Sequence, residues 1–226
     1  MSTTAVTIHQ QDSKPVLATG RKLVVELIGT FFLVFTVGAS VRSGSSLAPL
    51  AIGAALMVMV YAGGHISGGH YNPAVTVAAL TRGRIGLGEA VGYWIVQLVA
   101  GLLAAAVVAA TVTAHATRLS LSGHGLVSAV VVELLFTFAL AYVVLNVATS
   151  KDNPDNSFYG LAIGFTVFVG AVAVGGISGA AFNPAVVVGG AAMGLFPWTA
   201  LIYLVAEVIA GVIAGLVFRA LNPDDE

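Results

Sequence analysis

The sequence predicts an all-α integral membrane protein, in which six transmembrane helices and two re-entrant half-helices form an inverted repeat. Three observations lead to this prediction. The chain is 58% hydrophobic and only 8% charged, its apolar residues lie in long continuous runs, and the tetrapeptide Asn-Pro-Ala-Val occurs twice, at 72–75 and 183–186. A soluble domain of this composition would expose large apolar patches, and an outer-membrane barrel would need short alternating segments instead.

The apolar runs are each close to the ~20 residues that cross a ~30 Å hydrocarbon core. They predict spans at 22–41, 48–64, 86–112, 126–148, 158–175 and 198–218. Residues 1–20 are polar and lack the apolar core of a signal peptide, so we expect a short N-terminal tail, with a second tail at 220–226. The first repeat then occupies 21–112, a connecting loop 113–125, and the second repeat 126–219.

Residues outside the tetrapeptides also recur in the same order, which indicates a tandem duplication. Ile66-Ser67-Gly68 returns before the second asparagine as Ile177-Ser178-Gly179. Polar residues in the spans correspond as well: Glu26 and Thr30 with Glu133 and Thr137, Tyr93 and Gln97 with Tyr203 and Glu207. Because each half has an odd number of spans, the second copy is expected to be inverted relative to the first.

The basic residues predict the orientation, since cytoplasmic loops carry an excess of Lys and Arg. An inside N-terminus places most of them in the cytoplasm: Lys14, Arg21, Lys22, Arg82, Arg84, Lys151 and Arg219, against Arg42 and Arg118 outside. Both termini are then cytoplasmic and 113–125 is extracellular. The short loops and minimal tails are typical of a protein of a bacterial plasma membrane.

Each Asn-Pro pair predicts the start of a half-helix, because Asn is a preferred N-cap and Pro suits the first helical position. The segments 73–81 and 184–193 would be ~15 Å long, enough to reach the membrane midplane and no further. The inverted repeat brings the two N-termini together there. Each carries roughly +0.5 of an elementary charge, so the pair would repel cations and protons, while the amides of Asn72 and Asn183 donate to water.

Glycines before each asparagine predict an extended backbone close to the lumen, since non-helical backbone at this depth is tolerated only where it lines a wet cavity. The carbonyls expected to line it belong to Gly68, Gly69, His70, Tyr71, Gly179, Ala180, Ala181 and Phe182. His65 and His70 lie five apart and were weighed as a metal pair. Loop histidines bonded to backbone are the favoured interpretation, with His70 contributing its carbonyl more than its ring, and no metal site is expected.

The two Asn-Pro-Ala motifs, the Ser-Gly residues before them and the matching acids resemble the aquaporin, or major intrinsic protein, family, from about residue 22 to 219. The resemblance implies the hourglass fold, a homotetramer in the lipid bilayer with one pore per subunit, and passive conduction of water and small neutral solutes. It implies that the motif residues Asn72, Pro73, Ala74, Asn183, Pro184 and Ala185 form the pore centre. It also implies that Glu26 and Glu133 anchor the loops by accepting N–H bonds.

The resemblance places four residues at the constriction: Ile52, Ala171, Ala180 and Val186. Val186 directly follows the second Asn-Pro-Ala, where arginine is usual, and Ala171 stands where water-selective members often carry histidine. None of the four has a charge or a side-chain donor. The expected filter is therefore wide and apolar, similar to the tonoplast-type branch that passes glycerol, urea, ammonia or hydrogen peroxide besides water. Val187 replaces the acid typical of glycerol facilitators, so glycerol specialisation is not expected.

Three functions other than a multifunctional channel are compatible with six apolar spans. A coupled secondary transporter also uses inverted repeats but needs buried ion ligands, a strict water channel needs a narrower filter, and a junctional protein needs a blocked pore. Glu207 is interpreted as a polar contact between spans or as a gating group. The chain has no cysteine, no catalytic triad order and no phosphate loop, so no enzyme and no cofactor are expected. No basic run indicates a nucleic-acid partner.

Overall fold

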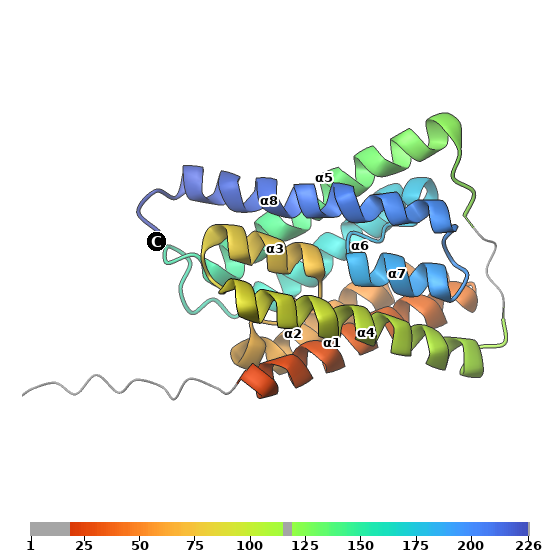
Figure 1. Ribbon diagram of the computed structural model, residues 1–226, viewed down its shortest axis with the longest axis horizontal. Coiled ribbons are helices and arrows are strands. Elements are labelled where there is room, and N and C mark those ends of the chain that lie inside the picture. The colour runs from red at the N-terminus through yellow and green to blue at the C-terminus, as the bar shows by residue number, and fades with distance from the viewer. Residues whose placement is uncertain (1–18, 115–118, 226) are drawn as a thin grey trace, which may run out of the picture.

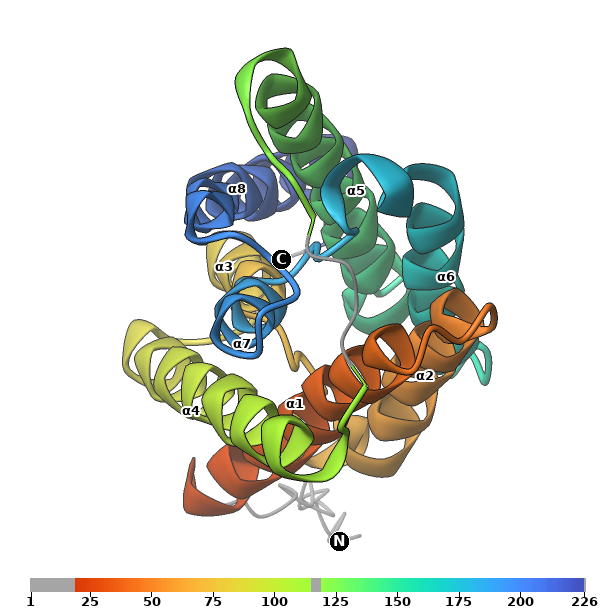
Figure 2. The same ribbon diagram turned by 90° about the vertical axis from the view of Figure 1, so that its right-hand side faces the viewer.

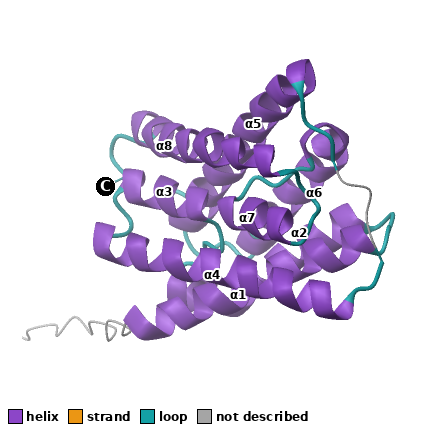
Figure 3. Ribbon diagram, turned by 45° about the vertical axis from the view of Figure 1, so that its right-hand side comes forward, coloured by secondary structure: helices purple, strands orange, loops and turns teal. Residues whose placement is uncertain are grey.

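The computed structural model describes residues 19–114 and 119–225, so the predicted tail up to residue 18, with Lys14, and also Arg118 lie outside it. The described residues form helices and connecting loops (Figure 3). The long helices are α1 (Thr19–Arg42), α2 (Ala48–Ser67), α4 (Leu87–Thr111), α5 (Gly123–Thr149), α6 (Tyr159–Ser178) and α8 (Tyr203–Leu221). Between them lie two short helices, α3 (Pro73–Arg82) and α7 (Pro184–Ala192), and a 3₁₀ turn, η1 (Trp198–Ile202).

Within residues 19–114 and 119–225, six helices, counting η1 with α8, are long and apolar enough to cross a membrane, which confirms the predicted fold class. Figure 1 shows them running along the long axis, with α3 and α7 end to end between them. Seen down that axis, α1, α2, α5 and α6 lie on one side, and α3 and α7 fill the space between α4 and α8 (Figure 2). The chain therefore forms a ring of long helices with two half-length helices meeting inside it.

The described helices overlap every predicted span, but α2 and α6 continue three residues beyond their predicted ends, to Ser67 and Ser178. The predicted ends fall at the pairs Gly63-Gly64 and Gly175-Gly176, and glycine is unfavourable in a helix interior. In the structure, Gly63 is a packing position, since a Cβ there would collide with the side chains of Tyr71 and Val25. The helices instead end at the next glycines, Gly68 and Gly179, which adopt left-handed φ values of 92° and 89°.

Each half-helix packs against the last long helix of the other repeat. A Cβ at Gly101 of α4 would lie 2.6 Å from the carbonyl oxygen of Ala185 in α7, and a Cβ at Gly211 of α8 would collide with that of Ala74 in α3. Only glycine permits such close approach of two backbones. The two repeats are therefore interlocked rather than placed side by side.

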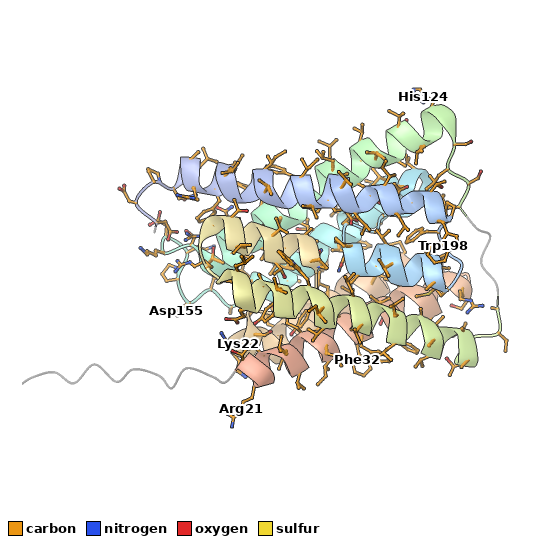
Figure 4. All side chains as sticks on the ribbon, in the orientation of Figure 1. Arg21, Lys22, Phe32, His124, Asp155 and Trp198 are labelled. Carbon is orange, nitrogen blue, oxygen red and sulfur yellow. The ribbon has the colours of Figure 1, made fainter. Side chains whose placement is uncertain are left out.

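The two ends of the molecule differ in charge. Arg21, Lys22 and Asp155 lie at the end where α1 begins, whereas His124 and Trp198 lie at the opposite end (Figure 4). At the first end, Asp225 joins two loops: its Oδ1 accepts from Arg82 Nη2 at 2.7 Å and its Oδ2 from the Lys151 backbone N–H at 2.8 Å. The lateral surface is apolar, with Phe32 47% exposed, as a lipid-facing helix requires.

Candidate functional site: a narrow pore between two helix tips

Both asparagines of the repeated motif cap a half-helix. Asn72 and Asn183 are extended, with φ of −158° and −161°, and proline follows each of them as the first helical residue. Asn72 Oδ1 accepts the Ala74 N–H at 2.8 Å, and Asn183 Oδ1 accepts the Ala185 N–H at 2.9 Å. The cap uses the amide oxygen, so each amide nitrogen is directed away from its own helix.

The two amide nitrogens connect the repeats. Asn72 Nδ2 donates to Phe182 O at 2.8 Å, and Asn183 Nδ2 donates to Tyr71 O at 2.9 Å. An amide nitrogen has two hydrogens, so each asparagine keeps one for a passing molecule. The two helix N-termini consequently meet tip to tip, and their partial positive charges converge at one point.

The loops before the asparagines are not extended, contrary to the sequence-based expectation. Left-handed φ values occur at Gly68, Gly69 and Tyr71 in the first loop, and at Gly179, Ala180 and Phe182 in the second. For a non-glycine residue this conformation costs of order 1–3 kcal/mol and persists only where the surroundings hold it. Gly68, Gly69 and Gly179 adopt these positive φ values without steric cost, and the loops turn at these positions instead of running straight.

Glu26 on α1 holds the first loop. Its Oε1 accepts from Ser67 Oγ at 2.7 Å and from the His70 N–H at 2.9 Å. Its Oε2 accepts from the Tyr71 N–H at 2.7 Å and from Gln97 Nε2 at 2.9 Å. The carboxylate is buried, and it thereby satisfies backbone donors that a loop at this depth could not pair with water.

Two acids hold the second loop. Glu133 accepts the Ala181 N–H at 3.0 Å and the Phe182 N–H at 2.7 Å. Glu207 accepts the Asn183 N–H at 2.8 Å. Gln97 donates to Glu26 of α1 and to Thr76 of α3, whereas Glu207 accepts from the backbone at the end of the second loop. The polar contact expected of Glu207 is therefore made to Asn183.

The cavities along the long axis are wide at both ends and narrow in the middle. The central cavity has a volume of only about 20 Å³, whereas the cavity beside Ala171 and Phe196 has about 300 Å³ and the one beside Lys22 and Glu89 about 400 Å³. Since a cavity needs roughly 10–15 Å³ to hold one water, the centre admits molecules singly. Narrow middle and wide mouths are the geometry of a pore.

The four residues assigned to the constriction lie where the central cavity meets the wide cavity beside Phe196, which we call the outer cavity. Ile52 and Ala180 line both cavities, Val186 lines the central one and Ala171 the outer one. The structure therefore brings Ile52, Ala180 and Val186 together and places Ala171 on the outer side of them. None supplies a polar side-chain atom at this point.

Among the eight carbonyls assigned to the pore, those of Tyr71 and Phe182 already accept the asparagine amides. His70, Ala180 and Ala181 line the central cavity, and Gly68 and Gly179 the wider cavities at either end. His70 also contributes through its ring, which the sequence did not indicate, because its Nδ1 lies 3.0 Å from Thr76 Oγ1. That contact fixes the ring beside the narrow cavity.

Apart from Ile52, Ala180 and Val186, the apolar lining of the central cavity was not predicted. Much of it comes from residues four apart on the four long helices of one side: Leu33 and Val37, Ile52 and Leu56, Leu140 and Val144, Ile163 and Val167. Residues four apart share a helix face, and the pairs correspond between the repeats. A search for apolar i, i+4 pairs that recur in both halves could have found them.

The fold and these cavities define a transmembrane pore built from an inverted repeat. The profile of the Major intrinsic protein family matches residues 40–218. Glycerol uptake facilitator protein-like 6 of Lactiplantibacillus plantarum is 36% identical over 220 residues, covering 91% of this chain and 100% of that protein. Aquaporin TIP1-1 of Arabidopsis thaliana is 39% identical over 189 residues, covering 80% and 74%.

A solved structure agrees in fold. The aquaglyceroporin from Plasmodium falciparum superimposes with a TM-score of 0.72 at 21% identity, covering 91% of this chain and 96% of that one. Together with the family profile and the relatives, this similarity shows that the chain belongs to the major intrinsic protein family.

Proposed function

We propose that this protein is a passive channel for water and small neutral solutes. The observation that carries the proposal is the meeting of two capped helix N-termini at a cavity of about 20 Å³. The spare amide hydrogens of Asn72 and Asn183 can bind an oxygen there, while the converging dipoles disfavour cations. A neutral hydrogen-bonding molecule is the species that such a site favours.

The apolar lining of the constriction, and not its width, supports the passage of solutes besides water. Ile52, Ala180 and Val186 place hydrocarbon around the passage, so a solute with a carbon backbone finds apolar contact there. The names of the relatives, a glycerol uptake facilitator and aquaporins, are in keeping with this interpretation. We assign glycerol, urea, ammonia and hydrogen peroxide as candidates, with a strict water channel as the competing function.

A coupled transporter is the other alternative. Coupling requires ion ligands near the midplane, whereas the described residues that line the central cavity are apolar apart from His70, Asn72 and Asn183. Proteoliposomes without any ion or proton gradient separate the two. A channel equilibrates the solute, and a transporter that needs a gradient does not.

The test of the filter is Val186→Arg. An arginine would add a fixed cation and five donors to the narrowest point, so glycerol and urea permeability should fall about tenfold or more relative to water permeability. Light scattering on the same vesicles gives both permeabilities, so differences in protein amount cancel. Val186→Leu is the matched control, because it adds bulk without charge. A wild-type glycerol-to-water ratio near zero would show that the protein is a strict water channel.

We further infer a homotetramer in a bacterial plasma membrane, with both termini in the cytoplasm. Family membership supports the assembly, and the position of Arg21, Arg84 and Lys151 beside the start of α1 supports the orientation. The division into repeats at 21–112 and 126–219 follows from the same pattern. Mass measurement in mild detergent tests the assembly, and a cleavable tag at each terminus tests the orientation.

A further inference from the structure

Glu207 on α8 is a buried acid whose second oxygen has no hydrogen-bond donor. The side chain is 0% exposed, and its Oε1 accepts the Asn183 N–H at 2.8 Å. Its Oε2 receives no N–H or O–H from the described residues. The neighbour of Glu207 is a second acid, since Glu133 accepts the N–H of Phe182, the residue directly before Asn183, at 2.7 Å. Two carboxyl groups can form a hydrogen bond only if one of them holds a proton.

In the first repeat, the position that corresponds to Glu207 is occupied by a glutamine, Gln97. There, Gln97 Nε2 donates to Glu26 Oε2 at 2.9 Å and completes the set of four donors around that carboxylate. In the second repeat, the N–H groups of Ala181 and Phe182 take the corresponding backbone places around Glu133, and Ser178 stands at the position that corresponds to Ser67. The fourth place belongs to Glu207, which can donate only in its protonated form.

A difference at one further position explains why an acid suits this place better than an amide. The second N–H of Gln97 is satisfied by Thr76 Oγ1 at 3.2 Å. The residue corresponding to Thr76 in the second repeat is Val187, which is buried and has no acceptor. A glutamine at 207 would leave one N–H unpaired, whereas a protonated carboxyl group has a single donor and keeps an acceptor for Asn183.

Electrostatics favours the same arrangement. Two ionised carboxylates in contact in a buried site repel each other, and one shared proton removes that repulsion. The described ion pairs, Lys22 with Glu89 and Asp225 with Arg82 and Arg84, lie at the end where α1 begins and leave the two acids uncompensated.

We propose that Glu207 is protonated in the folded protein and donates its proton to Glu133, so that the two acids hold the second asparagine loop as a singly charged pair. Glu207 is thus a positioning residue, which fixes Asn183 through its backbone N–H. The inference concerns the same pore as the proposed function, but the proton itself is observed without any measurement of transport.

Infrared difference spectroscopy tests the proton directly. The wild-type protein should show the carbonyl stretch of a protonated carboxylic acid at neutral pH, and Glu207→Gln should lose it. Glu89→Gln is the spectral control, because Glu89 pairs with Lys22 at 2.8 Å and should contribute no such band. A wild-type spectrum without the band, or a band of equal intensity in Glu207→Gln, would overturn the proposal.

A double variant tests whether a glutamine at position 207 would leave one N–H group without an acceptor. Glu207→Gln alone should lower the thermal midpoint, and adding Val187→Thr should recover it by supplying the acceptor that Thr76 supplies in the first repeat. Val187→Thr alone should not stabilise the protein. A double variant no more stable than Glu207→Gln would show that the donor count is wrong. Water permeability is measured in parallel: a protein with the band but without water flux would refute the channel and leave the shared proton intact.

Discussion

Replacing Glu26 by alanine removes the acceptor of four hydrogen bonds, two from backbone N–H groups of the first loop and two from the side chains of Ser67 and Gln97. The side chains of Ser67 and Gln97 can rotate, but the N–H groups of His70 and Tyr71 are fixed by the loop backbone. Each buried donor left unpaired costs ~1–3 kcal/mol, so the two backbone groups alone cost roughly 2–6 kcal/mol. Against a typical stability of about 5–15 kcal/mol, that is a large fraction of the total.

The assay is the thermal midpoint and the folded yield in detergent of Glu26→Ala, Glu26→Gln and Glu89→Ala. Glu26→Gln should fall between wild type and alanine, because its carbonyl still accepts while its NH₂ group faces other donors. Glu89→Ala should change little, since it loses only a partly exposed ion pair, worth about 0–1 kcal/mol. If Glu26→Ala were as stable as Glu89→Ala, the loop would not depend on this carboxylate, and the reasoning would be wrong.

Three other predictions concern the pore and the end of the chain. Asn183→Asp replaces a donor by a negative charge at the helix tips, so water flux should fall or cation leak should rise in vesicles; unchanged values of both would refute its role. The wild type lacks cysteine and should ignore mercuric chloride, whereas Ala180→Cys should be blocked by it, and a folded but resistant variant would place Ala180 outside the passage. Burial alone would raise the pKa of Asp225, but the Lys151 N–H and the Arg82 guanidinium hold that pKa below its ordinary value. A carboxyl group whose pKa is lower in the folded than in the unfolded protein stabilises the fold at pH values above the unfolded pKa, and this stabilisation is lost as the pH falls. Asp225→Asn should therefore have a lower thermal midpoint than wild type at pH 7, and the difference should shrink below about pH 4.

The half-helices could be predicted because their chemistry is local. An Asn-Pro pair fixes the cap and the first helical angle within two residues, and the observed caps at Asn72 and Asn183 need nothing else from the fold. The anchoring role of Glu26 and Glu133 came from the resemblance to the family, and the cost of an acid inside an apolar span explains why each needs such partners. The six spans followed from hydropathy, and their inversion from a tandem duplication with an odd number of spans in each half.

The parts that the sequence did not reveal depend on tertiary contacts. The span predicted to end at residue 64 continues to Ser67, and Gly63 within it packs closely against Tyr71. The left-handed φ of 48° at Tyr71 is disfavoured for a bulky residue, and no local pattern predicts it. The protein keeps it because Glu26 and Asn183 bond to the backbone on either side of the ring, and both lie far away in the sequence.

The bonds that join the two asparagines to the opposite loops have a consequence for how the protein is made. When the ribosome has completed the first repeat, Asn72 is present but Phe182, which accepts its amide at 2.8 Å, has not been synthesised. Gly211, against which the Ala74 backbone packs, has not been synthesised at that stage either. The first half-helix, α3, can therefore make its contacts with α8 only after the last helix has been synthesised. In an unfinished chain, the amide of Asn72 and the backbone of Ala74 therefore lack the contacts that the second repeat supplies in the complete protein.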